Sequence, residues 1–240
     1  MPQLARYQQI SNILGEQIAT GRYEPGAQLP TEQELSETFQ VNRHTVREAI
    51  KELKNDGLVF SVRGKGNFVT SDKVIYRLSS KVRFSQNILE AHLTPDARLL
   101  EAHVIPADNK LAAKFDLQPK DQVLHLEILR SVNGLPFSVT SSYLPAERFQ
   151  GLKELISGSF SLYALLKKHF QVEPVRRNSL IEVILPDCRE MELLQISARH
   201  PLLLVRSFAS DENKVPVEYV ITRTRGDIGC LSIDFDNPQR

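Results

Sequence analysis

Four side chains between residues 43 and 47 have the chemistry to read DNA bases. They are Arg43, His44, Thr45 and Arg47, and their N–H and O–H groups can hydrogen-bond to the base edges that the major groove exposes. Apolar residues recur at helical spacing at positions 46, 50 and 53, which predicts a helix with one packed face and one basic face. We therefore interpret this segment as a recognition helix, with Lys51 further along it on the phosphates.

A recognition helix needs a second helix to hold it, and the preceding residues supply one. Thr31 and Glu34 can form a capping box, which predicts a helix over residues 32–39. Asn42 can cap the next helix, so the residues between the two helices become the turn of a helix-turn-helix. We include Thr31 and Glu32, at the start of the first helix, among the residues expected at the DNA.

A hairpin is predicted after the recognition helix, and its tip combines glycines with basic side chains. The tip residues are Arg63, Gly64, Lys65 and Gly66, between two short apolar stretches. Such a wing can lay its backbone close to DNA, with Arg63 and Lys65 on phosphates or in the minor groove. We expect all four tip residues at the DNA.

The alternative interpretation of the basic helix is an ordinary solvated surface, because amphipathic helices often carry Lys and Arg outside. Total charge does not favour DNA binding, since residues 1–71 hold eight basic and eight acidic side chains. From residue 43 to residue 66, however, there are six basic and three acidic side chains. The positive excess is concentrated on the helix and the wing that would touch a duplex.

Residues 7–70 resemble the winged helix-turn-helix of the GntR family of bacterial transcription regulators. Many fixed spacings agree in order, and one departure is Asn42 where the family often has Ser, which can also cap a helix. The resemblance implies binding to an operator in double-stranded DNA. The matching residues are Tyr7, Ile10, Ile18, Gly21, Pro25, Gly26, Leu29, Pro30, Thr31, Glu32, Leu35, Phe39, Val41, Arg43, Thr45, Val46, Arg47, Ala49, Leu53, Gly57, Leu58, Gly64, Gly66, Phe68 and Val69.

Length and composition place the chain among globular proteins with room for two domains. It has 240 residues, of which 41% are hydrophobic and 25% charged. No apolar run has the length of a membrane span and the N-terminus lacks a signal-peptide pattern, so we expect a cytoplasmic protein without a membrane partner. Cys188 and Cys230 are expected to be reduced, packed thiols. We expect no cofactor and no metal site from neighbouring histidines, although distant ligands could converge.

The second part of the sequence predicts an α+β domain built on an antiparallel sheet, not a Rossmann fold. Its best hairpin signal is the pair Asn133-Gly134 between two strand-like runs. We assign residues 1–70 to a winged helix-turn-helix domain, 71–82 to a linker and 83–240 to an effector-binding and dimerisation domain. Strands are expected at 123–132, 137–144, 177–185, 202–210, 215–224 and 230–235, and helices at 162–170, capped by Ser161, and up to Leu194, capped by Asp187 with Glu190.

Basic side chains and helix N-termini in this domain favour an anionic ligand. Arg130, Arg206 and Arg223 lie in predicted strands otherwise rich in apolar residues, so each is either on an outer face or paired inside. Ser85 and Ser161 each begin a predicted helix, whose free N–H groups attract anions. Arginine together with such N-termini suits a phosphate or phosphonate group.

Residues 83–236 resemble the UTRA effector domain of the HutC-type branch of the GntR family, whose fold is like that of chorismate lyase. Short segments at 41–45, 83–87 and 130–134 look most like the repressors of phosphonate operons within this branch. The matching segments of the domain are 116–123, 129–136, 142–145, 161–163, 201–206, 216–219 and 224–227.

The resemblance also implies which residues bind the effector. Branch members that bind amino-sugar phosphates carry Arg-x-Arg where this chain has Ile128-Leu129-Arg130, and Glu where it has Thr140, so a smaller anion such as a phosphonate fits better. Glu218 and Tyr219 could instead be ordinary edge-strand residues. The anionic head is expected against Phe84, Ser85, Arg130, Ser159 and Ser161, and the remainder of the effector against Arg206, Glu218 and Tyr219.

Together these features predict a homodimeric repressor that binds an inverted-repeat operator and responds to a small anionic effector. A dimer is expected because two recognition helices that read successive major grooves need a two-fold partner. One alternative is an enzyme that acts on a small anionic substrate in its lyase-like domain, and another is an architectural DNA-binding protein without a ligand. The sequence has no nucleophile elbow, no HExxH and no phosphate loop, so we assign no catalytic residues.

Overall fold

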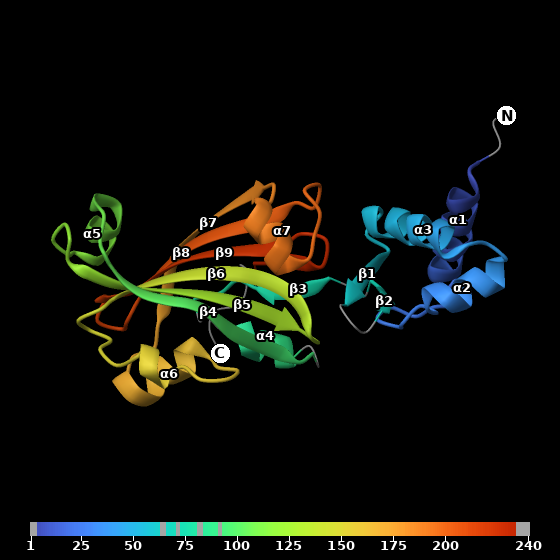
Figure 1. Ribbon diagram of the computed structural model, residues 1–240. Helices are drawn as coiled ribbons and strands as arrows, with labels where there is room; N and C mark the ends of the chain where they lie inside the picture. The colour runs from blue at the N-terminus through green and yellow to red at the C-terminus, as the bar shows by residue number, and fades with distance from the viewer. Residues whose placement is uncertain (1–3, 63–65, 71–72, 81–83, 91–92, 234–240) are drawn as a thin grey trace. The chain divides into compact units, whose positions relative to one another are not determined.

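The chain folds as two compact units, Met1–Lys73 and Val74–Arg240. Within the part of the chain that the structure describes, no helix is both long and apolar enough to cross a membrane. The computed structural model describes residues 4–62, 66–70, 73–80, 84–90 and 93–233 (Figure 1).

The first unit consists of three helices followed by a small hairpin, which confirms the predicted winged helix-turn-helix. Apolar residues recur every three or four positions along the helices, so each helix buries one side. The elements are α1 (Arg6–Ala19), α2 (Glu32–Phe39), α3 (Arg43–Asn55), β1 (Val59–Val62) and β2 (Gly66–Val69). Their buried core contains Ile10, Leu14, Leu29, Leu35, Val46, Ala49, Ile50, Leu53, Val59 and Val69.

Side-chain caps begin α2 and α3 at the residues that the sequence predicts. Thr31 Oγ1 accepts a hydrogen bond from the Glu34 N–H at 3.2 Å, and Glu34 Oε2 accepts one from the Thr31 N–H at 2.7 Å. Asn42 Oδ1 accepts from the Thr45 N–H at 2.8 Å. Gln40 ends α2 with a left-handed φ of 51°, which redirects the chain toward α3.

The wing is the antiparallel hairpin of β1 and β2, in which Val59 lies opposite Val69. Gln28, in the segment before α2, forms an isolated bridge to the middle of β2 and ties the wing to the helices. Gly66 has a φ of 110°, a backbone conformation that favours glycine. The other predicted tip residues, Arg63, Gly64 and Lys65, lie outside the described residues.

The second unit is built on a six-stranded antiparallel sheet in the order β4-β5-β6-β9-β8-β7, which confirms the predicted α+β class. The hairpin between β5 and β6 turns at Asn133 and Gly134, whose φ values of 50° and 78° suit a two-residue turn. The strands are β4 (Pro95–Pro106), β5 (Gln122–Val132), β6 (Leu135–Pro145), β7 (Val175–Ile184), β8 (Leu202–Ser210) and β9 (Pro216–Arg225).

Two further strands, β3 (Val74–Arg77) and β10 (Gly229–Ser232), pair in parallel outside this sheet. The expectation that residues 74–77 belong to a linker is therefore wrong, because they form a strand whose partner lies near the other end of the chain. The helices of this unit are α4 (Phe84–Glu90), α5 (Asn109–Phe115), α6 (Leu162–Phe170) and α7 (Cys188–Leu194), with a short 3-10 helix η1 (Lys153–Leu155).

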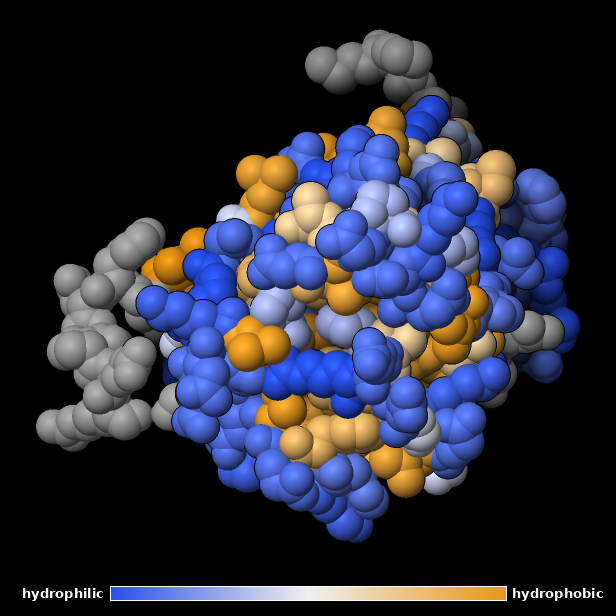
Figure 2. All heavy atoms as spheres, turned by 90° about the vertical axis from the view of Figure 1, so that its left-hand side faces the viewer, coloured by the Kyte–Doolittle hydropathy of each residue, from blue (hydrophilic) through white to orange (hydrophobic). Residues whose placement is uncertain are grey.

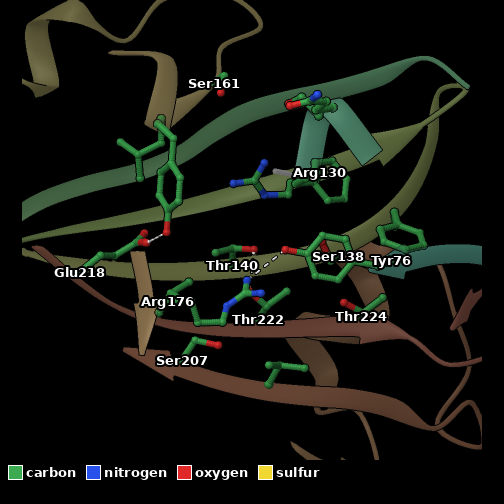
Figure 3. A pocket seen from close by; sticks show the side chains of 18 of the residues that line it. Tyr76, Arg130, Ser138, Thr140, Ser161, Arg176, Ser207, Glu218, Thr222 and Thr224 are labelled. Atoms are coloured by element: carbon green, nitrogen blue, oxygen red, sulfur yellow. Dashed lines mark hydrogen bonds between the residues drawn. The ribbon is translucent and has the colours of Figure 1, made fainter. Parts of the chain in front are cut away.

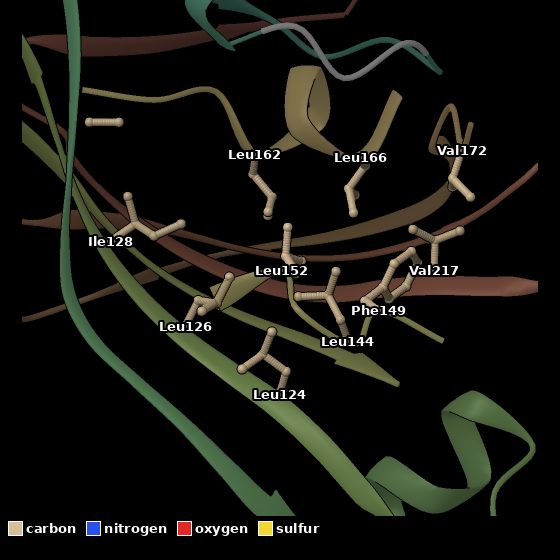
Figure 4. Packing of buried hydrophobic residues seen from close by; sticks show 11 residues of the cluster. Leu124, Leu126, Ile128, Leu144, Phe149, Leu152, Leu162, Leu166, Val172 and Val217 are labelled. Atoms are coloured by element: carbon tan, nitrogen blue, oxygen red, sulfur yellow. The ribbon is translucent and has the colours of Figure 1, made fainter. Parts of the chain in front are cut away.

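Helix α6 covers part of one face of the sheet. Leu162 and Leu166 point from α6 toward the sheet residues Leu126 and Leu144, and all four side chains are buried (Figure 4). On the opposite face, α5 packs on one cluster of strand residues and α7 on another. The surface at the α5 end is mostly hydrophilic, with apolar side chains in small groups (Figure 2).

Both cysteines are exposed free thiols, so the expectation that they are packed is wrong. Cys188 is the first residue of α7, a surface helix whose buried residues are Glu190 and Leu194. Cys230 lies in the short outer strand β10.

Candidate functional site

The basic side of α3 lies beside the start of α2. Arg47 Nε donates to Glu32 Oε2 at 2.7 Å, and Arg43 Nη2 donates to Gln33 Oε1 at 2.8 Å. The Arg47 side chain is 63% exposed and that of Glu32 34% exposed, so this ion pair stabilises the unit by at most about 1 kcal/mol. Both guanidinium groups can therefore exchange these partners for a phosphate or a base.

The remaining residues predicted at the DNA divide into exposed groups and groups that support the helices. His44 is exposed, and Lys51 Nζ lies 3.2 Å from Glu48 Oε2 at the surface. Thr31 Oγ1 donates to Glu34 Oε2 at 2.8 Å, and Thr45 Oγ1 donates to Asn42 Oδ1 at 2.9 Å. The two threonine hydroxyls thus reinforce the caps of α2 and α3.

Glu32 neutralises part of the basic surface. It pairs with Arg47 and also acts on Lys54, whose pKa is lowered by burial while the Glu32 carboxylate opposes that change. Gly66 is exposed at the tip end of the wing, and the other three tip residues lie outside the described residues. The described basic side chains are therefore arranged along α3, with the start of α2 holding them in place.

The second unit contains a cavity of about 350 Å³, which is large enough for a small organic anion (Figure 3). Its walls come from β3, α4, the start of α6, β7, β10 and the cavity-facing side of β5, β6, β8 and β9. The lining residues are Tyr76, Phe84, Ser85, Gln86, Leu89, Arg130, Phe137, Ser138, Thr140, Ser161, Leu162, Tyr163, Arg176, Val205, Ser207, Glu218, Val220, Thr222, Thr224 and Leu231.

Arg130 extends from β5 into this cavity (Figure 3). Its guanidinium carbon lies 4.7 Å from the centre of the Phe84 ring, a cation–π contact. Among the described residues, no side chain or backbone group forms a hydrogen bond or ion pair with the Arg130 guanidinium. Burial lowers the pKa of Arg130, an effect that the nearby Glu218 carboxyl opposes, but an arginine remains protonated in proteins. The cavity therefore contains a buried cation that forms no ion pair with the described residues.

Glu218 is the acidic residue among the cavity lining, and two hydroxyl groups donate to it. Ser142 Oγ donates to Glu218 Oε1 at 2.6 Å, and Tyr163 OH donates to Glu218 Oε2. Burial raises the pKa of Glu218, opposed by these hydrogen bonds and by the positive charges of Arg130 and Arg176. Burial also raises the pKa of Tyr163 well above its usual value, and the Glu218 carboxylate adds to the effect.

Hydroxyl groups line the floor of the cavity because alternate residues of β6 and β9 point to the same face. Thr140 and Thr222, which lie opposite each other, have their hydroxyl oxygens 3.3 Å apart. Ser138 Oγ is buried and has no hydrogen-bond partner within the described ranges. The floor can therefore donate hydrogen bonds to an anion that Arg130 attracts.

Five of the residues predicted to bind the effector line this cavity, and three do not. Ser159 lies outside the cavity, where its Oγ accepts from the Ala97 N–H at 3.4 Å. Arg206 pairs with Glu182, and Tyr219 stacks on Tyr143 with ring centres 6.2 Å apart. The residues that do line the cavity are Phe84, Ser85, Arg130, Ser161 and Glu218.

Strand alternation explains why Arg206 and Tyr219 are outside. On β8 the cavity side chains are Val205 and Ser207, so Arg206 between them points to the other face. On β9 Glu218 and Val220 face the cavity, so Tyr219 faces α5. Arg206 and Tyr219, expected around the effector, therefore lie on the face of the sheet opposite this cavity.

Several cavity residues were not predicted from the sequence. Tyr76 and Arg176 come from β3 and β7 and are 100 residues apart in the sequence, so no local signal connects them. Thr222 and Thr224 could have been found by stepping along β9 in twos from Glu218. Within the described ranges, no group of three or more His, Cys, Asp or Glu side chains is arranged to hold a metal ion.

Two family models match the chain. The UTRA domain matches residues 90–228, and the bacterial regulatory proteins of the gntR family match residues 6–69. The chain belongs to the GntR family. It is a transcription regulator of the HutC type, with a DNA-binding winged helix-turn-helix and a UTRA domain, and its relatives are named as regulators and not as enzymes.

Named relatives and solved structures of this GntR regulator cover nearly the whole chain. The transcriptional regulator PhnF of Escherichia coli K12 is 33% identical over 225 residues, 93% of this chain and 92% of the relative. The repressor NagR of Bacillus subtilis 168 is 28% identical over 92% of this chain and 90% of the relative. The crystal structure of PhnF from Mycobacterium smegmatis has a TM-score of 0.68 at 27% identity, covering 98% of this chain and all of that one.

Proposed function

We propose that this GntR regulator is a homodimeric, cytoplasmic repressor whose affinity for its operator falls when a small phosphonate or phosphate-like anion binds the UTRA cavity. Arg43, His44, Thr45 and Arg47 contact bases in the major groove, and Lys51 contacts phosphates. The wing tip adds phosphate or minor-groove contacts. Thr31 and Glu32 act from α2 by holding the recognition helix and its basic side chains.

The observation that supports an anionic effector is the guanidinium of Arg130 inside the cavity, which has no hydrogen-bond or ion-pair partner among the described residues. A cation removed from water without a counter-ion is unfavourable, and a bound oxyanion would supply the missing partner. Phosphonate and phosphate oxygens match the fork of an arginine and also accept from hydroxyls such as those of Ser138 and Thr140.

The balance of charge supports an anion over a cation or a neutral ligand. The cavity lining includes two arginines, Arg130 and Arg176, and one acid, Glu218, which is already hydrogen-bonded and whose pKa burial raises. Thr140 has a short neutral side chain, so among the described lining residues there is no second carboxylate to hold the hydroxyls of a sugar. A compact anion with few hydroxyl groups therefore fits best.

A homodimer follows from how a helix-turn-helix reads DNA. One recognition helix reads only a short half-site, and operators of such proteins repeat the half-site with two-fold symmetry. Effector binding lowers affinity if the liganded dimer presents its two recognition helices at a spacing that does not fit successive major grooves.

The test of anion binding is calorimetric titration of the full-length protein with methylphosphonate, inorganic phosphate and sulfate. Wild type should bind at least one of them, and Arg130→Ala should weaken binding by about tenfold or more, as expected for loss of a charge-assisted hydrogen bond. Arg206→Ala is the matched control, because Arg206 lies on the opposite face of the sheet and pairs with Glu182. Equal binding by wild type and Arg130→Ala would refute the cavity assignment, and no binding by wild type would favour a regulator without an anionic effector.

A further inference from the structure

Arg176, on β7, is bound to the segment that follows the DNA-binding unit in the chain. Its Nη1 donates to the carbonyl oxygen of Ser79 at 3.0 Å, and its Nη2 donates to Tyr76 OH at 3.0 Å. Its backbone N–H donates to the carbonyl oxygen of Ser80 at 2.8 Å, and its guanidinium lies 5.9 Å from the centre of the Tyr76 ring. One residue thus holds residues 76–80 through four contacts.

The same residue belongs to the cavity. Arg176 and Tyr76 both line it, together with Arg130 (Figure 3). An arginine has five N–H donors, and Arg176 uses one on Ser79 and one on Tyr76. Its Nε has no acceptor, and it forms no ion pair, within the part of the chain that the structure describes. Arg176 is therefore a second cation of the cavity without an acidic partner.

Tyr76 lies close to the point where the chain passes from the DNA-binding unit into the effector unit. The first unit ends at Lys73 and β3 begins at Val74, so Tyr76 is among the first residues of the effector unit. The Val74 N–H donates to the Ile228 carbonyl at 2.7 Å and the Leu78 N–H to the Ser232 carbonyl at 2.8 Å, which places β3 against β10. A ligand that touches Arg176 and Tyr76 acts on the segment through which the chain connects to the DNA-binding unit.

We propose that Arg176 is a second anion-binding residue of the cavity, and that an effector held by Arg130 and Arg176 fastens residues 76–80 onto β7. The effector class is an oxyanion with several terminal oxygens, such as a phosphonate or phosphate, because one such group can accept from both guanidiniums and from Tyr76 OH. The role of Arg176 rests on the proposed anionic effector. It adds the step by which binding in the cavity reaches the connection to the DNA-binding unit.

Calorimetric titration with inorganic phosphate tests the binding part. Arg176→Gln should raise the Kd of the full-length protein by about tenfold, and Arg176→Lys, which keeps the charge without the fork, should raise it less. Arg177→Gln is the matched control, because its neighbour Arg177 bonds to Ser210 Oγ and to the Asp211 carbonyl outside the cavity. It should change the Kd by less than about twofold.

Hydrogen exchange of the backbone over residues 74–80 tests the fastening part. Saturating phosphate should slow hydrogen exchange in this segment in wild type and in Arg177→Gln. In Arg176→Gln it should not, even at the higher phosphate concentration needed to saturate that variant. A purely structural role for Arg176 would change exchange without phosphate and leave the response to phosphate intact. If Arg176→Gln is unstable, Arg176→Lys takes its place in both measurements, and cooperative thermal unfolding of Arg176→Lys would show that its fold is retained.

Three outcomes would overturn the role of Arg176. Phosphate binding by Arg176→Gln with the wild-type Kd would exclude it as a ligand, and unchanged exchange over residues 74–80 in wild type would exclude the fastening. If Arg130→Ala loses phosphate binding while Arg176→Gln keeps it, the proposed regulator survives and only the role of Arg176 falls. If wild type binds none of phosphate, methylphosphonate and sulfate, both fall together.

Discussion

In the UTRA cavity, the basic side chains lack ion-pair partners among the described residues, whereas the acidic side chain has hydrogen-bond donors. Arg130 and Arg176 form no ion pair among the described residues, whereas Glu218 accepts from two hydroxyl donors. Burying a cation without a counter-ion costs stability, so such groups are expected mainly where a ligand completes them. This imbalance among the individual side chains is the basis of the proposed oxyanion effector.

Glu218→Gln tests how the buried carboxyl contributes to stability. Because burial raises the pKa of Glu218, the folded protein holds its proton more tightly than the unfolded chain does. The contribution of this group is fully present below its ordinary pKa of 4.5 and is lost as the pH rises through the raised value. The free energy of unfolding of the variant minus that of wild type should therefore increase over this window, by about 1.4 kcal/mol for each pKa unit between the two states.

Urea denaturation of wild type and Glu218→Gln at several pH values measures that difference. Other titrating groups are common to both proteins and cancel. A difference that stays constant from below pH 4.5 upward would show that the carboxyl has the same proton affinity in both states.

At the scale of elements, local chemistry in the sequence predicted the helix boundaries well. Thr31 with Glu34, Asn42 and Asp187 with Glu190 each accept the cap hydrogen bond expected of them. The Asn133-Gly134 turn also forms as expected. These signals succeed because a cap or a tight turn depends on residues within four positions of each other.

Elements that depend on distant partners were missed. β3 has only four residues and forms a strand because it pairs with β10. Residues 74–77 alone carry no signal of that distant partner. Arg206 and Tyr219 were assigned to the site by position, yet each strand places alternate residues on opposite faces. The choice between faces depends on the register of β8 and β9 with their neighbours, and this is a property of the whole sheet.

Asn42→Ala tests the cap that begins the recognition helix. The Thr45 N–H would lose its acceptor at 2.8 Å, so the first unit should lose about 1 kcal/mol of stability. Asn42→Ser is the control, since a serine hydroxyl can accept the same hydrogen bond. Urea denaturation followed by circular dichroism measures both variants; equal midpoints for wild type and Asn42→Ala would mean that the cap adds no stability.

Arg47→Ala tests the basic side of α3. Its ion pair with Glu32 is exposed, so the fold should be retained, whereas operator affinity should fall by roughly 10- to 100-fold for the loss of a base contact. Arg22→Ala, which removes an exposed arginine after α1 in the same unit, is the control. Fluorescence anisotropy with an operator selected from random duplexes gives both affinities. An unchanged affinity for Arg47→Ala would contradict the assignment of α3 to the major groove.

At the scale of the whole molecule, the chain combines a unit that binds DNA with a unit that carries a polar, positively charged cavity. As a regulator of the GntR family, it needs a physical link between the two activities. Ligand binding and DNA binding must influence each other by the same free energy in both directions. An effector that weakens operator binding is therefore itself bound less tightly by the protein on its operator.

The most direct test of this account is operator affinity measured by fluorescence anisotropy at fixed ionic strength, with and without methylphosphonate or phosphate. The anion that binds in the calorimeter should weaken the operator complex of wild type by about 5- to 150-fold, the usual range of allosteric coupling. It should leave the complex of Arg130→Ala unchanged, and Arg206→Ala should respond as wild type does. An anion that binds wild type without changing its operator affinity, or that releases Arg130→Ala equally well, would contradict control of DNA binding through the cavity.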